Sequence, residues 1–94
     1  MIETQLLEQT ASMLDIPLPS LIKDSLRSYL ERHLWEEQAT IHEMKAKHGV
    51  SSFEDMKRRY ESGSLEEEGS WEDFMRLEHA EARVEKMRNL LLQV

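Results

Sequence analysis

The chain has 94 residues, and its 12 lysines and arginines against 19 aspartates and glutamates give it a formal charge of −7. It lacks cysteine, which excludes disulfide frameworks, thiolate zinc sites and a cysteine nucleophile. Only three glycines and two prolines interrupt a composition rich in Leu, Glu, Arg and Met, which predicts an all-α protein. We expect a single domain over residues 1–94, located in the cytoplasm, because the sequence shows neither a membrane span nor a secretion signal.

The first predicted helix covers residues 2–14, where apolar residues recur at spacings of three and four. Pro17 and Pro19 follow it. Each proline removes a backbone donor and disfavours helical angles in the residue before it, so the two prolines end this helix. Because so short a helix is not stable alone in water, it needs a packing partner.

A long helix is predicted over residues 20–48, with Ser20 as its N-cap and Gly49 as its C-terminal stop. Apolar residues in its first half step by four: Ile22, Leu26, Leu30 and Leu34. A step of four passes a full turn of 3.6 residues by about 40°, so the apolar stripe winds around the helix. We therefore expect this helix to contact neighbours on two sides.

A third helix is predicted over residues 52–62. A capping box opens it, formed either by Ser51 with Glu54 or by Ser52 with Asp55. We expect the helix to bury three apolar side chains: Phe53, Met56 and Tyr60.

The last predicted helix covers residues 71–93, with Ser70 as its N-cap and Asp73 as the capping partner. Its apolar residues alternate steps of three and four: Leu77, Ala80, Val84, Met87, Leu91 and Val94. This heptad seam is typical of a helix that packs along another, here the helix over 20–48. The fold prediction is an antiparallel bundle of the four helices. We expect dimerisation to complete it, because so short a chain hides only about 60–65% of the surface that its unfolded form exposes.

Metal binding and catalysis are disfavoured by the spacing of the polar residues. The candidate ligands are four histidines: His33, His42, His48 and His79. No Glu precedes a His by three residues, and no two histidines lie one helical turn apart, so neither a di-iron nor a zincin pattern is present. Paired carboxylates need a concave pocket, for which a chain of this size leaves little room. We predict a protein that is not an enzyme and holds no metal or cofactor.

A nucleic-acid-binding regulator is one alternative. The basic residues concentrate at five positions: Lys45, Lys47, Lys57, Arg58 and Arg59. Acidic residues interleave with them, and a net charge of −7 opposes approach to a phosphate backbone. We therefore favour a helix C-terminus for the first two lysines and a solvated face for the other three residues.

Protein recognition is the function that the composition favours. Aromatic residues and methionines fill interfaces, although they are equally ordinary core residues. Four amphipathic helices present more apolar surface than so short a chain can bury within itself. The predicted partner-binding residues on the last helix are Trp71, Phe74, Leu77, Val84, Met87 and Leu91. The expected partner is another protein, a second copy, or both, and a purely structural homo-oligomer is a further alternative; neither a membrane nor a small-molecule substrate is expected.

Three segments resemble a known group of proteins: SLRSYLER over 25–32, KHGVSSFED over 47–55 and GSWEDF over 69–74. They resemble the antitoxin halves of bacterial and archaeal toxin–antitoxin modules, and the resemblance covers residues 20–92. In that group a long helix ends at a lysine-aromatic-glycine turn, a short acidic-capped helix follows, and a Ser-Trp-Glu-Asp opening leads into the last helix. Here His48 stands where the group usually has an aromatic residue.

The resemblance implies a chain that binds and neutralises a small cytoplasmic toxin, commonly a ribonuclease or a nucleotidyltransferase. A toxin site built for RNA or nucleotides is basic, so an acidic helical protein can occupy it. The acidic residues expected to make this contact are Glu66, Glu67, Glu68, Glu72 and Asp73. The alternative that residues 66–68 form a plain solvated loop stays open. Many antitoxins begin with a DNA-binding β-strand, which the helical spacing of residues 2–14 does not predict here.

Overall fold

The computed structural model describes residues 2–63, 65 and 69–94, and these residues form helices and turns without a strand among them. In chain order the helices are α1 (Ile2–Leu14), α2 (Leu18–His48), α3 (Phe53–Glu61) and α4 (Trp71–Leu91). The all-α class is confirmed, and each boundary lies within two residues of its predicted position. The three predicted contact residues Glu66, Glu67 and Glu68 lie outside the described residues.

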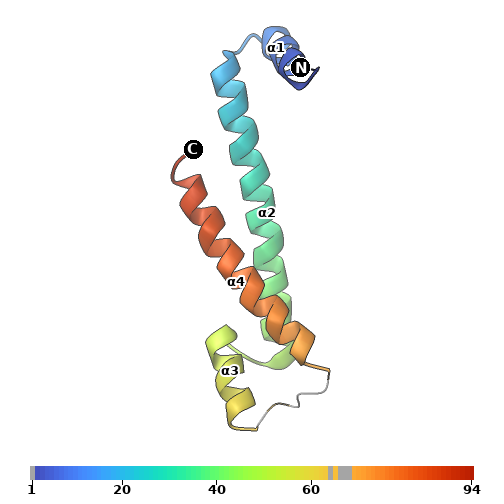
Figure 1. Cartoon of the computed structure of the whole chain (residues 1–94), viewed down its shortest axis with the longest axis vertical. Helices are drawn as coiled ribbons and strands as arrows, with labels where there is room; N and C mark the ends of the chain where they lie inside the picture. The colour runs from blue at the N-terminus through green and yellow to red at the C-terminus, as the bar shows by residue number, and fades with distance from the viewer. Residues whose placement is uncertain (1, 64, 66–68) are drawn as a thin grey trace.

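The molecule is a rod rather than a sphere. Its principal extents are 60 × 23 × 20 Å. Its radius of gyration is 19.3 Å, whereas a compact domain of this length has a value of about 12 Å. α4 runs antiparallel along α2, α3 lies at the far end of that pair, and α1 crosses the first turns of α2 (Figure 1). The prediction of one bundle of four helices is therefore wrong. α2, α3 and α4 pack together, whereas α1 packs against the start of α2 at the opposite end of the molecule from α3.

The junction between α1 and α2 departs from its predicted geometry. α1 ends at Leu14, and Asp15 directly after it has a left-handed φ of 56°. α2 then begins at Leu18, with Pro17 at the N-cap position and no side-chain cap, so the prediction of Ser20 as the cap is wrong. Pro19 is tolerated inside the first turn because the backbone N–H that a proline lacks has no helical partner there.

The turn between α2 and α3 follows the predicted signals. Gly49 adopts left-handed angles with φ 63°, and its backbone N–H donates to the Lys45 carbonyl. The Ser52 hydroxyl accepts the Asp55 backbone N–H at 3.1 Å, which confirms Ser52 as the N-cap; the return bond of a full capping box, from the Asp55 carboxylate, goes to Ser51 instead of Ser52. The Asp55 carboxylate in turn accepts the Ser51 backbone N–H at 2.9 Å. This bond, with help from Arg59, holds the pKa of Asp55 below its usual 3.8.

The buried core lies at one end of the rod, where the last turns of α2 meet α3 and the start of α4. Its buried side chains are Met44, Val50, Met56, Phe74 and Leu77. Phe53 and Tyr60 pack around it, with ring centroids 4.9 and 5.0 Å from that of Phe74. The predicted burial of the three α3 side chains is therefore confirmed in full for Met56 and in part for Phe53 and Tyr60. The Phe53 backbone N–H also donates to Glu81 of α4 at 3.0 Å, which fastens α3 to α4. We call this region the core end.

The heptad seam of α4 faces α2 of the same chain. Leu77, Ala80 and Val84 are buried. The later seam residues Met87, Leu91 and Val94 are only half-buried. In the first half of α2, Leu30 alone reaches the buried class among the described residues. The seam therefore fills the core end and is incomplete toward the chain's C-terminus.

Candidate binding surfaces

Trp71, the first residue of α4, is exposed but held in place. Its side chain has a relative exposure of 57%. Its ring stacks on Phe74 with centroids 5.4 Å apart, and the edge of Tyr60 meets it at 6.3 Å. Tyr60 is itself fixed by a hydrogen bond between its hydroxyl and that of Ser70. The indole is therefore both exposed and fixed in orientation, a combination that tryptophan often shows at protein interfaces.

Asp73 joins the start of α4 to the end of α2 and is not the exposed acid that the sequence predicted. It is 5% exposed. Its Oδ2 lies 2.7 Å from Lys47 Nζ and 2.8 Å from His48 Nε2. The hydrogen bond from Lys47, followed by that from His48, holds the pKa of this carboxyl below its usual 3.8. The predicted cap pair is also wrong, because Ser70 makes no side-chain cap and Asp73 turns inward.

The structure divides the predicted partner-binding residues into three groups. Phe74, Leu77 and Val84 are buried in the chain's own core and offer no surface to a partner in this conformation. Met87 and Leu91 are half-buried along α2. Trp71 and Glu72 are exposed at the start of α4. Of the described residues in that prediction, these last two are the ones that the structure leaves exposed.

The predicted basic cluster is largely neutralised by carboxylates. Lys47 pairs with Asp73. Arg58 and Arg59 pair with Asp55, at 3.6 and 3.4 Å. Lys45 is half-buried beside a groove between α2 and α4, and Lys57 is exposed. These contacts disfavour a continuous phosphate-binding face.

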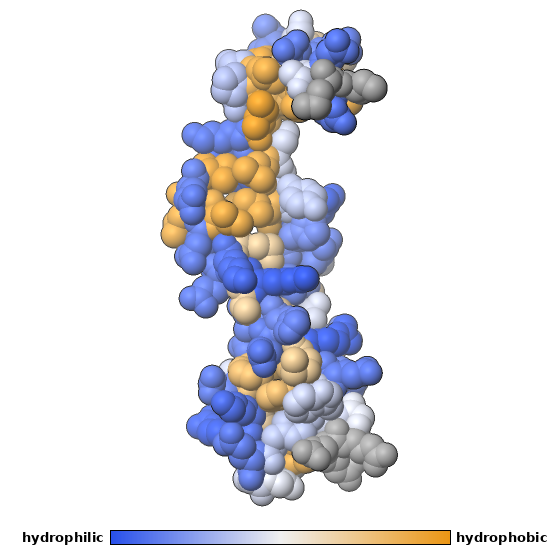
Figure 2. Space-filling model, in the orientation of Figure 1, coloured by the Kyte–Doolittle hydropathy of each residue, from blue (hydrophilic) through white to orange (hydrophobic). Residues whose placement is uncertain are grey.

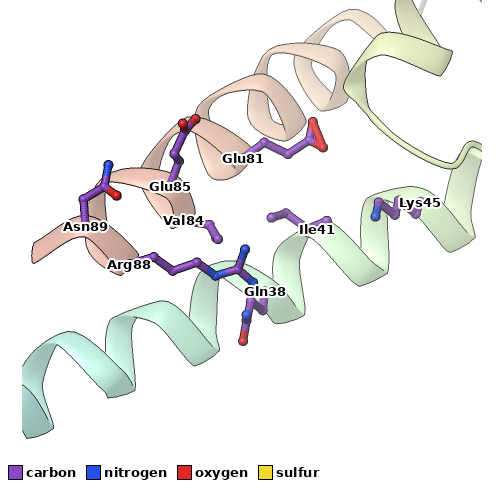
Figure 3. A pocket seen from close by; sticks show the side chains of 8 residues that line it. All are labelled: Gln38, Ile41, Lys45, Glu81, Val84, Glu85, Arg88 and Asn89. Atoms are coloured by element: carbon purple, nitrogen blue, oxygen red, sulfur yellow. The ribbon is translucent and has the colours of Figure 1, made fainter. Parts of the chain in front are cut away.

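That groove, of about 540 Å³, lies between α2 and α4 (Figure 3). Ile41 and Val84 meet between the two helices in its depth. Its polar lining comes from both helices: Gln38 and Lys45 of α2, and Glu81, Glu85, Arg88 and Asn89 of α4. The lining contains no serine, threonine or histidine to act as a nucleophile or proton shuttle. In the described part of the chain, no three His, Asp or Glu side chains gather so as to hold a metal ion.

A second surface lies at the opposite end of the rod, and of its residues only Met87 and Leu91 were predicted to bind a partner. We call residues 18–33 and 85–94 the open end. Ile22 and Leu26 of α2 are 46% and 48% exposed there, and Leu90 of α4 is 47% exposed. Figure 2 shows apolar surface over this region and on α1. The winding stripe of α2 was the signal, because it turns Ile22 and Leu26 away from the seam with α4 and leaves them about half exposed.

The open end holds an apolar groove of about 530 Å³. Its lining is mostly apolar and comes from the start of α2 and the end of the chain: Leu18, Pro19, Ile22, Lys23, Leu26, Gln93 and Val94. Arg27 Nη2 donates to the Val94 carbonyl at 2.9 Å and ties the end of the chain to α2 beside the groove. The groove is therefore a defined hollow between two tethered segments.

The model of a protein family described as the uncharacterized protein MJ0235 family matches residues 1–94. This one match spans α1 through α4. No curated protein and no solved structure matches the chain. Within the described residues, no helix is long and apolar enough to cross a membrane.

Proposed function

We propose that this chain, which belongs to the uncharacterized protein MJ0235 family, is a non-enzymatic protein-binding module. The proposed role is that of an antitoxin-like inhibitor, which binds and neutralises a small basic toxin of the ribonuclease or nucleotidyltransferase type in the cytoplasm. The observation that carries the proposal is Trp71, which is 57% exposed although its ring stacks on Phe74. Tryptophan is among the residues that most often dominate the binding energy of an interface.

The charge around this residue supports a basic partner. Between the two segments of the open end, residues 34–84, which include Trp71, contain seven basic and thirteen acidic residues. Glu72 is exposed directly beside Trp71. An anchoring aromatic side chain on an acidic surface is complementary to a site that binds RNA or nucleotides, because such a site is basic. The resemblance of residues 47–55 and 69–74 to antitoxins supports the same role.

We also propose that the chain acts as a homodimer. The rod shape and the apolar open end support self-association, since both leave surface that a compact domain would bury. The open end and Trp71 lie at opposite ends of the rod, so a dimer can leave Trp71 free for a different protein. A purely structural homo-oligomer is the second candidate function, favoured by the open end and not by Trp71.

The test is to look for a small basic protein encoded by the adjacent reading frame and to co-express it with this chain. We expect that protein to slow growth of a bacterial host, and the wild-type chain to restore growth and to co-purify with it. Trp71→Ala should weaken the complex by about 2 kcal/mol, the usual threshold for a dominant interface residue. This loss corresponds to an increase in Kd of about 30-fold.

Trp35→Ala is the matched control. Trp35 is 71% exposed, and it lies within α2, on a different helix from Trp71. Its replacement should leave the affinity unchanged. The proposal fails if the adjacent frame encodes no protein that the chain binds and neutralises, or if the two tryptophan variants bind equally well.

A further inference from the structure

The chain exposes more surface than a protein of its mass needs. Its accessible surface is 7191 Å² at 11.1 kDa. A compact monomer of that mass exposes about 5,700 Å². The surplus of about 1,500 Å² exceeds the roughly 800 Å² that one partner contributes to a standard interface. One stable dimer interface can therefore be built from surface that this fold leaves uncovered.

The open end is where this surplus is apolar. Its groove of about 530 Å³ is lined by Ile22, Leu26 and Val94 among others. It continues the seam that α2 and α4 form at the core end, where Leu77 and Val84 are buried. A further helix laid in the groove would extend the same packed layer of apolar side chains.

α1 has the shape and the apolar residues for this position in a second copy. Ala11 is 4% exposed, whereas Leu6 and Met13 are 60% and 78% exposed. Leu6 and Met13 are seven residues apart and share one face of α1, about 10 Å from end to end. The groove residues Leu18 to Leu26 span about 12 Å of α2. The exposed apolar face of α1 thus matches the groove in length.

The charges of α1 and of the open end are opposite. α1 contains Glu3 and Glu8 and no basic residue. The open end has five basic and three acidic residues in a chain whose formal charge is −7. An acidic helix is attracted to a region with net positive charge, which favours this pairing over packing of two open ends face to face.

We propose that two copies of the chain pair through their open ends, with α1 of each copy lying in the groove between α2 and the C-terminal end of the other. This inference rests on the homodimer proposed above and names the surface that forms it. Because each copy supplies one α1 and one groove, the exchange is reciprocal and closes with two-fold symmetry. Trp71 takes no part in it.

The first experiment measures the mass of the purified full chain by sedimentation equilibrium. We expect the wild type to reach twice the 11.1 kDa of one chain at micromolar concentration. Leu26→Glu in the groove and Leu6→Glu on α1 should each weaken dimerisation at least 30-fold while the helical circular dichroism signal stays. Trp35→Glu is the control and should remain dimeric. A wild type that is monomeric up to 100 μM overturns both this inference and the proposed homodimer.

The second experiment separates the position of α1 from dimerisation itself. Because the chain has no cysteine, Met13→Cys and Leu26→Cys can be made as single-cysteine proteins, mixed, and oxidised mildly. We expect a disulfide between position 13 of one copy and position 26 of the other, with a yield unchanged on dilution above the Kd. A third single-cysteine protein, Trp35→Cys, serves as the control. The α1 exchange is overturned, and the homodimer still stands, if the dimer forms mainly the disulfide between the two copies of position 26. The same holds if position 13 forms a disulfide with position 26 no more readily than with position 35.

Discussion

Because the core lies at one end of the rod, we predict that Leu77→Ala greatly lowers the free energy of unfolding. Leu77 is 0% exposed and belongs to the core cluster that contains Met44 and Met56. Replacing a fully buried leucine by alanine costs about 2.7–5 kcal/mol, since it removes buried methyl groups and leaves a cavity. The unbranched methionines can refill part of that cavity, so we expect a value near the lower limit, about 3 kcal/mol. Such a loss is a large fraction of the 5–14 kcal/mol or so that stabilises a domain of this length.

The assay is urea unfolding followed by circular dichroism at 222 nm, at a protein concentration below the Kd of the dimer. A loss of about 3 kcal/mol also lowers Tm by roughly 12–24 °C in a domain of this size. Leu92→Ala is the matched control, because Leu92 is the same residue type at 86% exposure. It should change the free energy of unfolding by less than about 0.5 kcal/mol. Equal losses for the two variants would refute the assignment of the core to this end.

Two further predictions concern polar contacts. The lowered pKa of Asp73 means that this carboxyl stabilises the fold at pH values above its unfolded pKa, near 3.8, and that this stability is lost as the pH falls through the folded pKa. Asp73→Asn should therefore cost about 1.5–3 kcal/mol at pH 7 and progressively less as the pH falls below 3.8, measured by urea unfolding; a cost that does not fall with pH would contradict the ion pair with Lys47. Ser52→Ala should lower the free energy of unfolding by about 1 kcal/mol, because it removes the cap of α3. Hydrogen exchange should show the loss first at the Asp55 amide, and unchanged protection there would refute the cap.

Local signals predicted the helices because their causes lie within a few residues. Gly49 ends α2 through its left-handed backbone, and Ser52 caps α3 through a bond to a residue three positions away. The position of Pro19 was harder to predict. A proline at that point is compatible either with a break in the chain's helical structure or with the first turn of a helix. The sequence near Pro19 does not distinguish these two structures.

Contacts between distant segments could not be predicted in the same way. Asp73 has the spacing of a capping residue after Ser70, but its carboxylate binds Lys47 and His48, about 25 residues away in the chain. The seam of Leu77 and Val84 is apparent from its period, yet periodicity does not tell whether a second chain or α2 of the same chain covers it. In the structure α2 covers it, so Leu77 and Val84 are not part of the surface that we propose for partners.

Small-angle X-ray scattering of the full chain over a concentration series tests the central claim most directly, namely that the fold leaves one end uncovered and that a second copy covers it. At the lowest concentrations we expect a rod about 60 Å long, as in the structure. The mass from forward scattering should rise to twice 11.1 kDa as the concentration increases. A single species of 11.1 kDa at every concentration, with a radius of gyration near the roughly 12 Å of a compact domain, would contradict the claim.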